Sequence, residues 1–210
     1  MDRRSAKASS PVTYVKGSSD GAADGGARRG VRVGGAASGR VDECECLELL
    51  QQIVGGLEHV HACGLVHRDV KPSNLCFSDG LLKLVDFGLA KPYGEATEGG
   101  HLDAIYPGAG ANTESVGTPS YAAPEQLRGA EVSSAADMFP LGLILFELFA
   151  VFGSAMERAK TFGELRQGSI PPAFRARWPR LAALLRTLIA ERPEDRPACG
   201  DVRREIVDCR

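Results

Sequence analysis

Four side chains that could act together on a phosphate group lie close to one another in the chain. Asp69, Lys71 and Asn74 fall within the run His-Arg-Asp-Val-Lys-Pro-Ser-Asn, and Asp86 opens an Asp-Phe-Gly triplet soon after it. The Asp69 carboxylate can orient the proton of an attacking hydroxyl, and the Lys71 ammonium can offset the charge of a transferring phosphate. Magnesium ions prefer oxygen ligands and retain several waters, so Asn74 and Asp86 suffice to hold them beside a nucleotide. This spacing indicates phosphoryl-transfer chemistry.

The two motifs resemble the catalytic loop and the metal-binding triplet of the protein kinases, in the same order and at a hairpin-sized separation. The resemblance implies ATP and Mg²⁺ as cofactors. The alternative is a loop whose polar side chains only cap turns. The site residues implied by the resemblance are Asp69 and Lys71 for catalysis, Asn74 and Asp86 for the metal, Lys71, Ser73, Asn74, Cys76 and Asp86 for ATP, and His67 and Phe87 for structure.

A stretch rich in Gly, Ser and Thr, residues 89–122, resembles the activation segment of that family. It ends with Gly-Thr-Pro-Ser-Tyr and Ala-Pro-Glu, which is similar to the serine/threonine branch, as is Lys71. The resemblance implies that Arg68 binds a phosphate on Thr113 through a guanidinium–phosphate pair. It also implies that the Thr118 hydroxyl contacts the catalytic residues. The alternative for Thr113 is that it only solvates a loop.

The elements around the loop can be predicted from local patterns. Asp42 and Glu45 predict a capping box, apolar residues then recur at three- and four-residue spacing, and Gly64 predicts the helix end. Two short apolar runs, residues 75–77 and 82–85, flank a Ser-Asp-Gly turn and predict a β-hairpin. The catalytic loop is therefore expected between a helix and a hairpin.

A second helix is predicted to begin at Asp137, because an almost continuous apolar run follows it. Asp137 could cap this helix, and Pro140 is expected in its first turn, where a missing N–H costs little. The kinase resemblance gives Asp137 a further role, which is to bind the backbone of the catalytic loop. It also pairs Arg196 with Glu125.

Composition and charge limit the remaining function classes. The chain has 210 residues and a formal net charge of −2, which gives no reason to expect nucleic acid or an anionic membrane as partner. The longest apolar run, residues 141–152, is too short to span a bilayer. The six cysteines show no metal-binding spacing, so we expect free thiols in the cytoplasm.

The chain divides into two parts by composition. Residues 1–40 are dominated by Gly, Ala, Ser and Arg, and only the segment 12–15 is strand-like, so this part is predicted to be disordered. Residues 41–210 resemble the C-terminal lobe of a protein kinase, a mainly α fold with a short β-hairpin at the active site. The glycine-rich loop and strand lysine of a kinase N-terminal lobe have no counterpart in the sequence, so that lobe is expected to be missing.

Residues 152–174 resemble one group within the family, the kinases of the α subunit of translation initiation factor 2. The segment carries a Met-Glu-Arg start and a Leu-Arg end before a Pro-Pro turn. The resemblance implies that this helix docks the folded substrate during translation control under stress. Met156, Phe162 and Leu165 are the expected docking residues on one helical face, and the alternative is that they only pack on the lobe.

Two function classes follow from these observations. In the first, the chain belongs to a serine/threonine kinase of initiation factor 2 and lacks the N-terminal lobe, so the isolated chain is expected to show negligible phosphotransfer. In the second, it is a catalytically inactive binding module, or decoy, that docks substrate or another kinase. The sequence predicts neither the upstream sensor nor whether the chain forms dimers.

Overall fold

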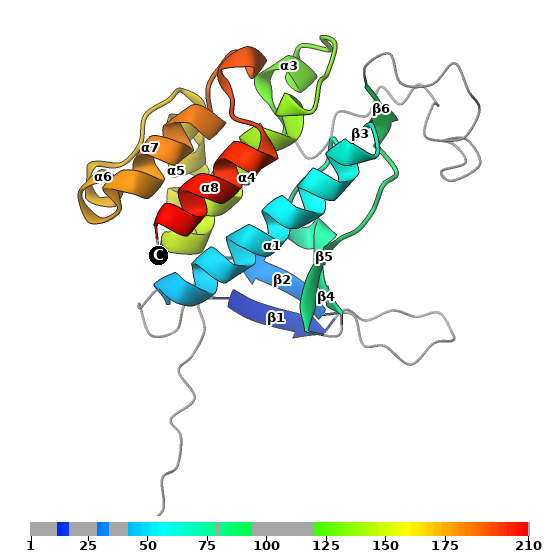
Figure 1. Ribbon diagram of the computed structural model, residues 1–210. Coiled ribbons are helices and arrows are strands. Elements are labelled where there is room, and N and C mark those ends of the chain that lie inside the picture. Colours follow the sequence, from blue (N-terminus) through cyan, green and yellow to red (C-terminus); the bar gives the residue numbers. More distant parts are fainter. Residues whose placement is uncertain (1–11, 17–28, 34–41, 79, 94–119, 210) are drawn as a thin grey trace, which may run out of the picture.

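The computed structural model describes residues 12–16, 29–33, 42–78, 80–93 and 120–209. Helices make up most of these residues, and a four-stranded sheet lies on one side of them (Figure 1). The helices are α1 (Glu43–Ala62), α3 (Pro124–Leu127), α4 (Ala135–Phe149), α5 (Ala155–Arg166), α6 (Pro172–Arg177), α7 (Pro179–Leu188) and α8 (Cys199–Asp208), with 3₁₀ turns η1 (Pro72–Asn74) and η2 (Pro193–Asp195). The strands are β1 (Val12–Lys16), β2 (Arg29–Val33), β3 (Leu65–Val66), β4 (Leu75–Ser78), β5 (Leu81–Leu84) and β6 (Lys91–Pro92). The described part of the chain is thus mainly helical, as expected from the sequence.

The long helix α1 follows the pattern expected from the sequence. The Asp42 side chain accepts a hydrogen bond from the backbone N–H of Glu45 at 3.1 Å, which satisfies one of the free amides of the first turn. At the other end Gly64 adopts a positive φ of 72°, which a residue without Cβ tolerates easily. The apolar face of α1 packs against α8, β5 and α4, so this helix connects the hairpin to the helical core (Figure 1).

Helix α4 runs through the centre of the core. Residues 136–149 are all buried, as the apolar sequence predicts for a central helix. Gly142 allows α7 to approach closely, because a Cβ there would lie 2.8 Å from the Ile189 Cγ2 atom. None of the helices in the described ranges is both long and apolar enough to cross a membrane.

Two expectations about the start of α4 were wrong. The helix begins at Ala135, so Asp137 is not its cap and lies inside the first turn. Pro140 consequently falls in the second turn, where its missing N–H removes a hydrogen bond to the carbonyl of Ala136. The physical reason is that two alanines, which are strong helix formers, extend the helix towards its N-terminus, while the Asp137 side chain binds elsewhere.

The predicted hairpin is present, and it belongs to a larger sheet than expected. Strands β4 and β5 pair antiparallel, with Leu75 opposite Leu84, and the strand order of the sheet is β1-β2-β4-β5. Gly30 of β2 lies opposite Cys76 of β4, and Val12 of β1 lies opposite Val33.

The prediction that residues 1–40 are disordered therefore fails for the segments of β1 and β2. A composition averaged over forty residues hides two runs of five that are rich in β-branched residues. The outer edge of β4 presents backbone N–H and C=O groups to which such a run can add. Two segments of this Gly-rich part thus share a sheet with the predicted lobe.

Candidate active site

The predicted catalytic loop, residues 67–74, brings three of the predicted residues into direct contact. Lys71 Nζ lies 2.6 Å from Asp69 Oδ2, and the Asn74 side-chain amide donates to the same oxygen at 3.0 Å and to the Asp69 carbonyl at 2.8 Å. Asp69 and Asn74 are buried, whereas Lys71 is partly exposed. The result is a carboxylate held in one orientation by a cation and an amide, as an oriented catalytic base requires.

Asp86 reaches the same region because the end of the hairpin is bound to the loop. The backbone N–H of Val85 donates to the Asn74 carbonyl at 2.9 Å, and the Val85 carbonyl accepts from His67 Nε2 at 3.2 Å. Asp86 follows directly, in a left-handed conformation with φ of 66°, and its Oδ1 accepts from the Gly88 N–H at 3.3 Å. A non-glycine residue at positive φ is held there by its surroundings, which is common at functional sites.

His67 connects these parts as a neutral ring. Its Nδ1 accepts a hydrogen bond from the Asp69 N–H at 3.3 Å, so the ring proton must lie on Nε2, which donates to Val85. Burial lowers the pKa of His67, which keeps this tautomer neutral near pH 7. The ring also packs against Phe87, with 4.8 Å between centroids. His67 and Phe87 thus pack against each other and support the backbone on both sides of the site, at Asp69 and at Val85.

Asp137 anchors the loop from the central helix α4. Its carboxylate accepts from the backbone N–H groups of His67 and Arg68, both at 2.8 Å, and lies 2.9 Å from His61 Nε2. Asp137 is fully buried, and Arg68 has a positive φ of 68°. These bonds hold a backbone conformation that an arginine rarely adopts. His61 was not among the predicted site residues, because its partner is 76 positions away in the sequence.

Two nitrogens of the Arg68 guanidinium lack a partner within the part of the chain that the structure describes. The Nε and Nη1 atoms are buried without a hydrogen bond there, while the Arg68 carbonyl accepts from the Gln126 side chain at 2.9 Å. A buried guanidinium favours a nearby anion. Thr113 and Thr118, the predicted contacts of this region, lie outside the described residues.

The expected pair of Glu125 and Arg196 is present and is bidentate. Arg196 Nη1 and Nη2 donate to the two Glu125 carboxylate oxygens at 2.6 and 2.8 Å. The same guanidinium also donates to the backbone carbonyls of Ala135, Ala190 and Glu191. Both side chains are buried, so this pair fastens α3, at the end of the activation-segment region, to the loop before α8.

A second buried network was not predicted from the sequence. The Tyr121 hydroxyl donates to Glu147 Oε2 at 2.5 Å, and Arg158 Nε donates to Glu147 Oε1 at 2.6 Å. Arg158 also donates to the Tyr121 oxygen at 2.6 Å. Burial and the adjacent Glu147 raise the pKa of Tyr121, so the hydroxyl remains a donor. The arginine of the Met-Glu-Arg run was the available signal, but its partner could not be inferred from spacing.

Replacing Arg158 with Met is expected to lower the free energy of unfolding by roughly 1–3 kcal/mol, because one oxygen of the buried Glu147 carboxylate loses its donor. Urea unfolding followed by circular dichroism measures the change. The matched control is Lys160→Met on the same helix, whose exposed pair with Glu164 spans 3.8 Å and should contribute little. Equal effects of the two substitutions would contradict the prediction.

The expected docking residues do not share one face of α5. Phe162 is 4% exposed and Leu165 is fully buried, whereas Met156 is 82% exposed. The docking prediction is therefore wrong for Phe162 and Leu165, and the alternative, packing on the lobe, describes them. Phe162 packs edge-on against Tyr121, with 5.7 Å between ring centroids, because burying an aromatic ring in the core is more favourable than exposing it.

The residues expected around the nucleotide fit a metal–nucleotide site in their chemistry. Both hydrogen bonds of the Asn74 side chain come from its nitrogen, which leaves the amide oxygen, a suitable Mg²⁺ ligand, outside these bonds. Ser73 is exposed in η1 and Cys76 is half-buried in β4. Within the described ranges, no group of three acidic, histidine or cysteine side chains could by itself hold a metal ion. A site made of one amide, one carboxylate and nucleotide phosphates is compatible with that finding.

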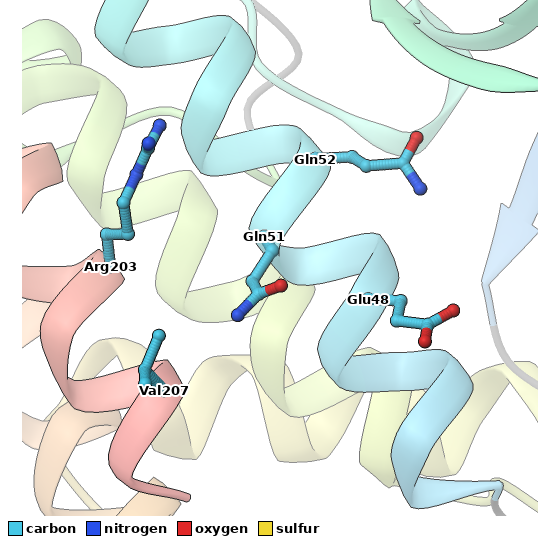
Figure 2. Close-up of a pocket in the computed structure, with 5 residues that line it drawn as sticks. All are labelled: Glu48, Gln51, Gln52, Arg203 and Val207. Carbon is cyan, nitrogen blue, oxygen red and sulfur yellow. The ribbon is translucent and has the colours of Figure 1, made fainter. Parts of the chain in front are cut away.

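A separate hollow lies between α1 and α8. It is lined by Glu48, Gln51, Gln52, Arg203 and Val207, and Figure 2 shows Gln51 pointing towards α8 while Gln52 points to the opposite side of α1. Gln52 Oε1 accepts from the backbone N–H of Leu82 on β5 at 2.7 Å. None of these residues belongs to the predicted site, so this hollow is distinct from the catalytic loop.

Comparison with known proteins identifies the family. A model of the protein kinase domain matches residues 28–205, which is most of the chain. The chain belongs to the protein kinase family. The match begins before residue 41, so it includes the segment of β2 as well as the helical lobe.

The curated relatives of this kinase chain include kinases of initiation factor 2. This chain is 38% identical over 158 residues to eukaryotic translation initiation factor 2-alpha kinase 3 of Bos taurus. The aligned region covers 75% of this chain and 14% of that relative. The chain is 36% identical over 168 residues to kinase 1 of the same series from Rattus norvegicus, covering 75% and 27%. The interferon-induced, double-stranded RNA-activated protein kinase of Mus musculus is 34% identical over 172 residues, covering 81% and 31%. The chain therefore spans less than a third of the length of each of these relatives.

Proposed function

We propose that this chain provides the C-terminal lobe of a serine/threonine protein kinase that transfers the γ-phosphate of ATP to the α subunit of translation initiation factor 2. The observation that supports the proposal most directly is the cluster of Asp69, Lys71 and Asn74. Lys71 and Asn74 both lie within 3.0 Å of the same Asp69 carboxylate oxygen, in a loop that Asp137 anchors. A loop that only capped turns would not need a buried carboxylate held by both a cation and an amide.

In this proposal each residue of the cluster has a separate task. Asp69 orients the substrate hydroxyl and accepts its proton, and Lys71 lies beside it to offset the negative charge of the transferring group. Asn74 and Asp86 would hold Mg²⁺, which when bound neutralises the phosphate oxygens. Ser73 and Cys76 would face the nucleotide. The neutral His67 ring donates a hydrogen bond to the Val85 carbonyl, and this bond holds the end of the hairpin, and therefore Asp86, next to the loop.

The nucleotide site needs a second lobe under this proposal. The sequence contains neither a Gly-x-Gly-x-x-Gly motif nor a Val-Ala-x-Lys motif. We therefore expect negligible phosphotransfer by the purified chain and robust transfer by a completed kinase, in which the N-terminal lobe of one of the relatives precedes these residues. Transfer of ³²P from Mg-ATP to the purified α subunit measures both. Inactivity of a well-folded completed kinase would contradict the proposal.

The substrate assignment rests on the names of the relatives and on the start of α5. Met156 is the one predicted docking residue that is exposed, and Ser154 caps the helix by accepting from Glu157 at 3.1 Å. An exposed methionine at an ordered helix start suits the capture of a folded partner, because its flexible thioether adapts to an apolar surface.

Replacing Met156 with Asp in the completed kinase is expected to raise the KM for the folded α subunit about tenfold, which corresponds to about 1.4 kcal/mol. The KM for a short serine peptide should not change, because a peptide does not reach α5. The matched control is Val207→Asp, which changes another exposed apolar residue, on α8. Unchanged KM for the folded substrate would remove Met156 from the docking surface.

Activation by phosphorylation forms part of the proposal. The buried Nε and Nη1 atoms of Arg68 have no partner in the described ranges, and a phosphate on Thr113 would supply one. Thr118 would contact Asp69 and Lys71. Mass spectrometry of the active completed kinase should show phosphate in residues 89–122, and an active protein without any phosphate there would contradict this part of the proposal.

The second candidate function is a binding module that docks substrate or another kinase without catalysis. Binding of the α subunit by the purified chain, together with an inactive completed kinase, would select this function. Both candidates are consistent with a cytoplasmic location, which the six free thiols favour. The net charge of −2 gives neither candidate a reason to bind nucleic acid or membranes.

A further inference from the structure

Three side chains from three helices form a continuous row behind the catalytic loop. Cys199, the first residue of α8, has its Sγ 3.5 Å from His61 Nδ1 on α1. His61 Nε2 lies 2.9 Å from Asp137 Oδ2 on α4. Asp137 in turn accepts the backbone N–H groups of His67 and Arg68. The row thus runs from the edge of the lobe to the residue that precedes Asp69.

The chemistry of the three groups decides which of them donates and which accepts in each hydrogen bond. A carboxylate only accepts hydrogen bonds, so His61 must carry a proton on Nε2 in order to bind Asp137. In a neutral ring Nδ1 is then an acceptor, which needs a donor. The Cys199 thiol is such a donor, because burial raises its pKa to about 12 and keeps it protonated. The other contact of this sulfur, Met138 Sδ at 3.8 Å, is a weak acceptor.

We propose that Cys199 is a positioning residue whose thiol holds His61 in the tautomer with the proton on Nε2. Through that proton His61 orients the Asp137 carboxylate towards the catalytic loop. A histidine that carried its proton on Nδ1 would turn a lone pair towards Asp137, and the carboxylate would lose one of its three donors. Any effect of Cys199 on phosphotransfer rests on the proposed function, whereas its effect on the His61 tautomer does not.

The surroundings of His61 agree with this role. The ring is mostly buried, with 12% of its side chain exposed, and Tyr93 packs edge-on against it at 6.3 Å between centroids. The Tyr93 hydroxyl donates to the His61 carbonyl at 3.2 Å, which fixes the backbone there. Glu58 and Arg203, two charged groups that act on the Cys199 thiol, form an ion pair with each other.

The orientation of Asp137 matters because Arg68 is held at a φ of 68°. Such a conformation is strained in a non-glycine residue and persists only where the surroundings impose it. Asp137 supplies the hydrogen bond to the Arg68 N–H. Loosening this carboxylate would let the loop relax and move Asp69 away from its position.

Nuclear magnetic resonance of the ¹⁵N-labelled 210-residue chain tests the tautomer directly. The chain has only four histidines, so His61→Gln identifies the His61 ring signals. The expected spectrum shows the ring proton on Nε2, the nitrogen that faces Asp137. In Cys199→Ala this state should lose population, and in Cys199→Ser, whose hydroxyl is also a donor, it should return. A parent spectrum with the proton on Nδ1, or no change in Cys199→Ala, would overturn the proposal.

A matched variant separates this effect from general loosening of the core. Cys46 is also buried, its pKa is also raised to about 12, and its thiol donates to the Leu148 carbonyl at 3.2 Å. Cys46→Ala should leave the His61 signals unchanged, and an equal shift in both variants would overturn the proposal.

In the completed kinase Cys199→Ala should lower kcat roughly tenfold, because a loosened Asp137 would let the loop shift and misplace Asp69, and it should leave the KM for ATP unchanged. Recovery of kcat in Cys199→Ser supports the proposal, and an unchanged kcat in Cys199→Ala overturns its catalytic part. An inactive parent kinase would contradict the proposed function and leave the spectroscopic result intact.

Discussion

Replacing Asp69 with Asn in the completed kinase is expected to lower phosphotransfer to the α subunit by about 10²–10⁴-fold. The amide has nearly the same shape as the carboxylate, so the hydrogen bond from Asn74 can be kept. It cannot accept the proton of the attacking hydroxyl, and it no longer pairs with Lys71 at 2.6 Å. The loss should therefore appear in kcat, because it removes an interaction made in the transition state.

The control for this prediction is Asp201→Asn. Asp201 is exposed on α8 and pairs with Arg204 in the same helix, far in sequence from the catalytic loop. Initial rates with saturating Mg-ATP compare the two variants with the parent. If Asp69→Asn were as active as the parent, Asp69 would not be the catalytic carboxylate, and the assignment of the cluster would be withdrawn.

Replacing Arg196 with Ala is expected to destabilise the chain by about 3–5 kcal/mol, because the Glu125 carboxylate would remain buried without its partner. Three backbone carbonyls would lose their donor at the same time. This loss is large compared with the 5–15 kcal/mol by which domains are usually stable, so a marginal fold could unfold altogether. Urea or thermal unfolding of the purified chain measures it.

Arg192 provides the matched control on the same loop. It also makes a bidentate contact, to Asp195 at 2.8 Å through both Nε and Nη2, but that pair is exposed to solvent. Arg192→Ala should barely shift the unfolding midpoint, since water replaces the lost contact. Similar shifts of the unfolding midpoint in Arg196→Ala and Arg192→Ala would mean that burial does not determine how much the Arg196–Glu125 pair contributes to stability.

The sequence alone determined the features that depend on neighbours along the chain. The cap of α1 by Asp42, the β4–β5 hairpin and the buried run of α4 each follow from the period of the apolar residues and from turn residues. The catalytic loop belongs to the same class, because Asp69, Lys71 and Asn74 are close in sequence and one loop can bring them together. The family resemblance depended on these local motifs as well.

The tertiary structure decided which distant groups became partners. Spacing could not show that Phe162 and Leu165 turn into the core, or that segments of residues 1–40 pair with β4, because burial and strand pairing depend on what lies opposite. The same holds for the row from Cys199 through His61 to Asp137, whose members come from three helices. The spacing of apolar residues along the chain predicts which side chains face inwards. The packing of the helices determines which group becomes the ion-pair or hydrogen-bond partner of a buried polar side chain.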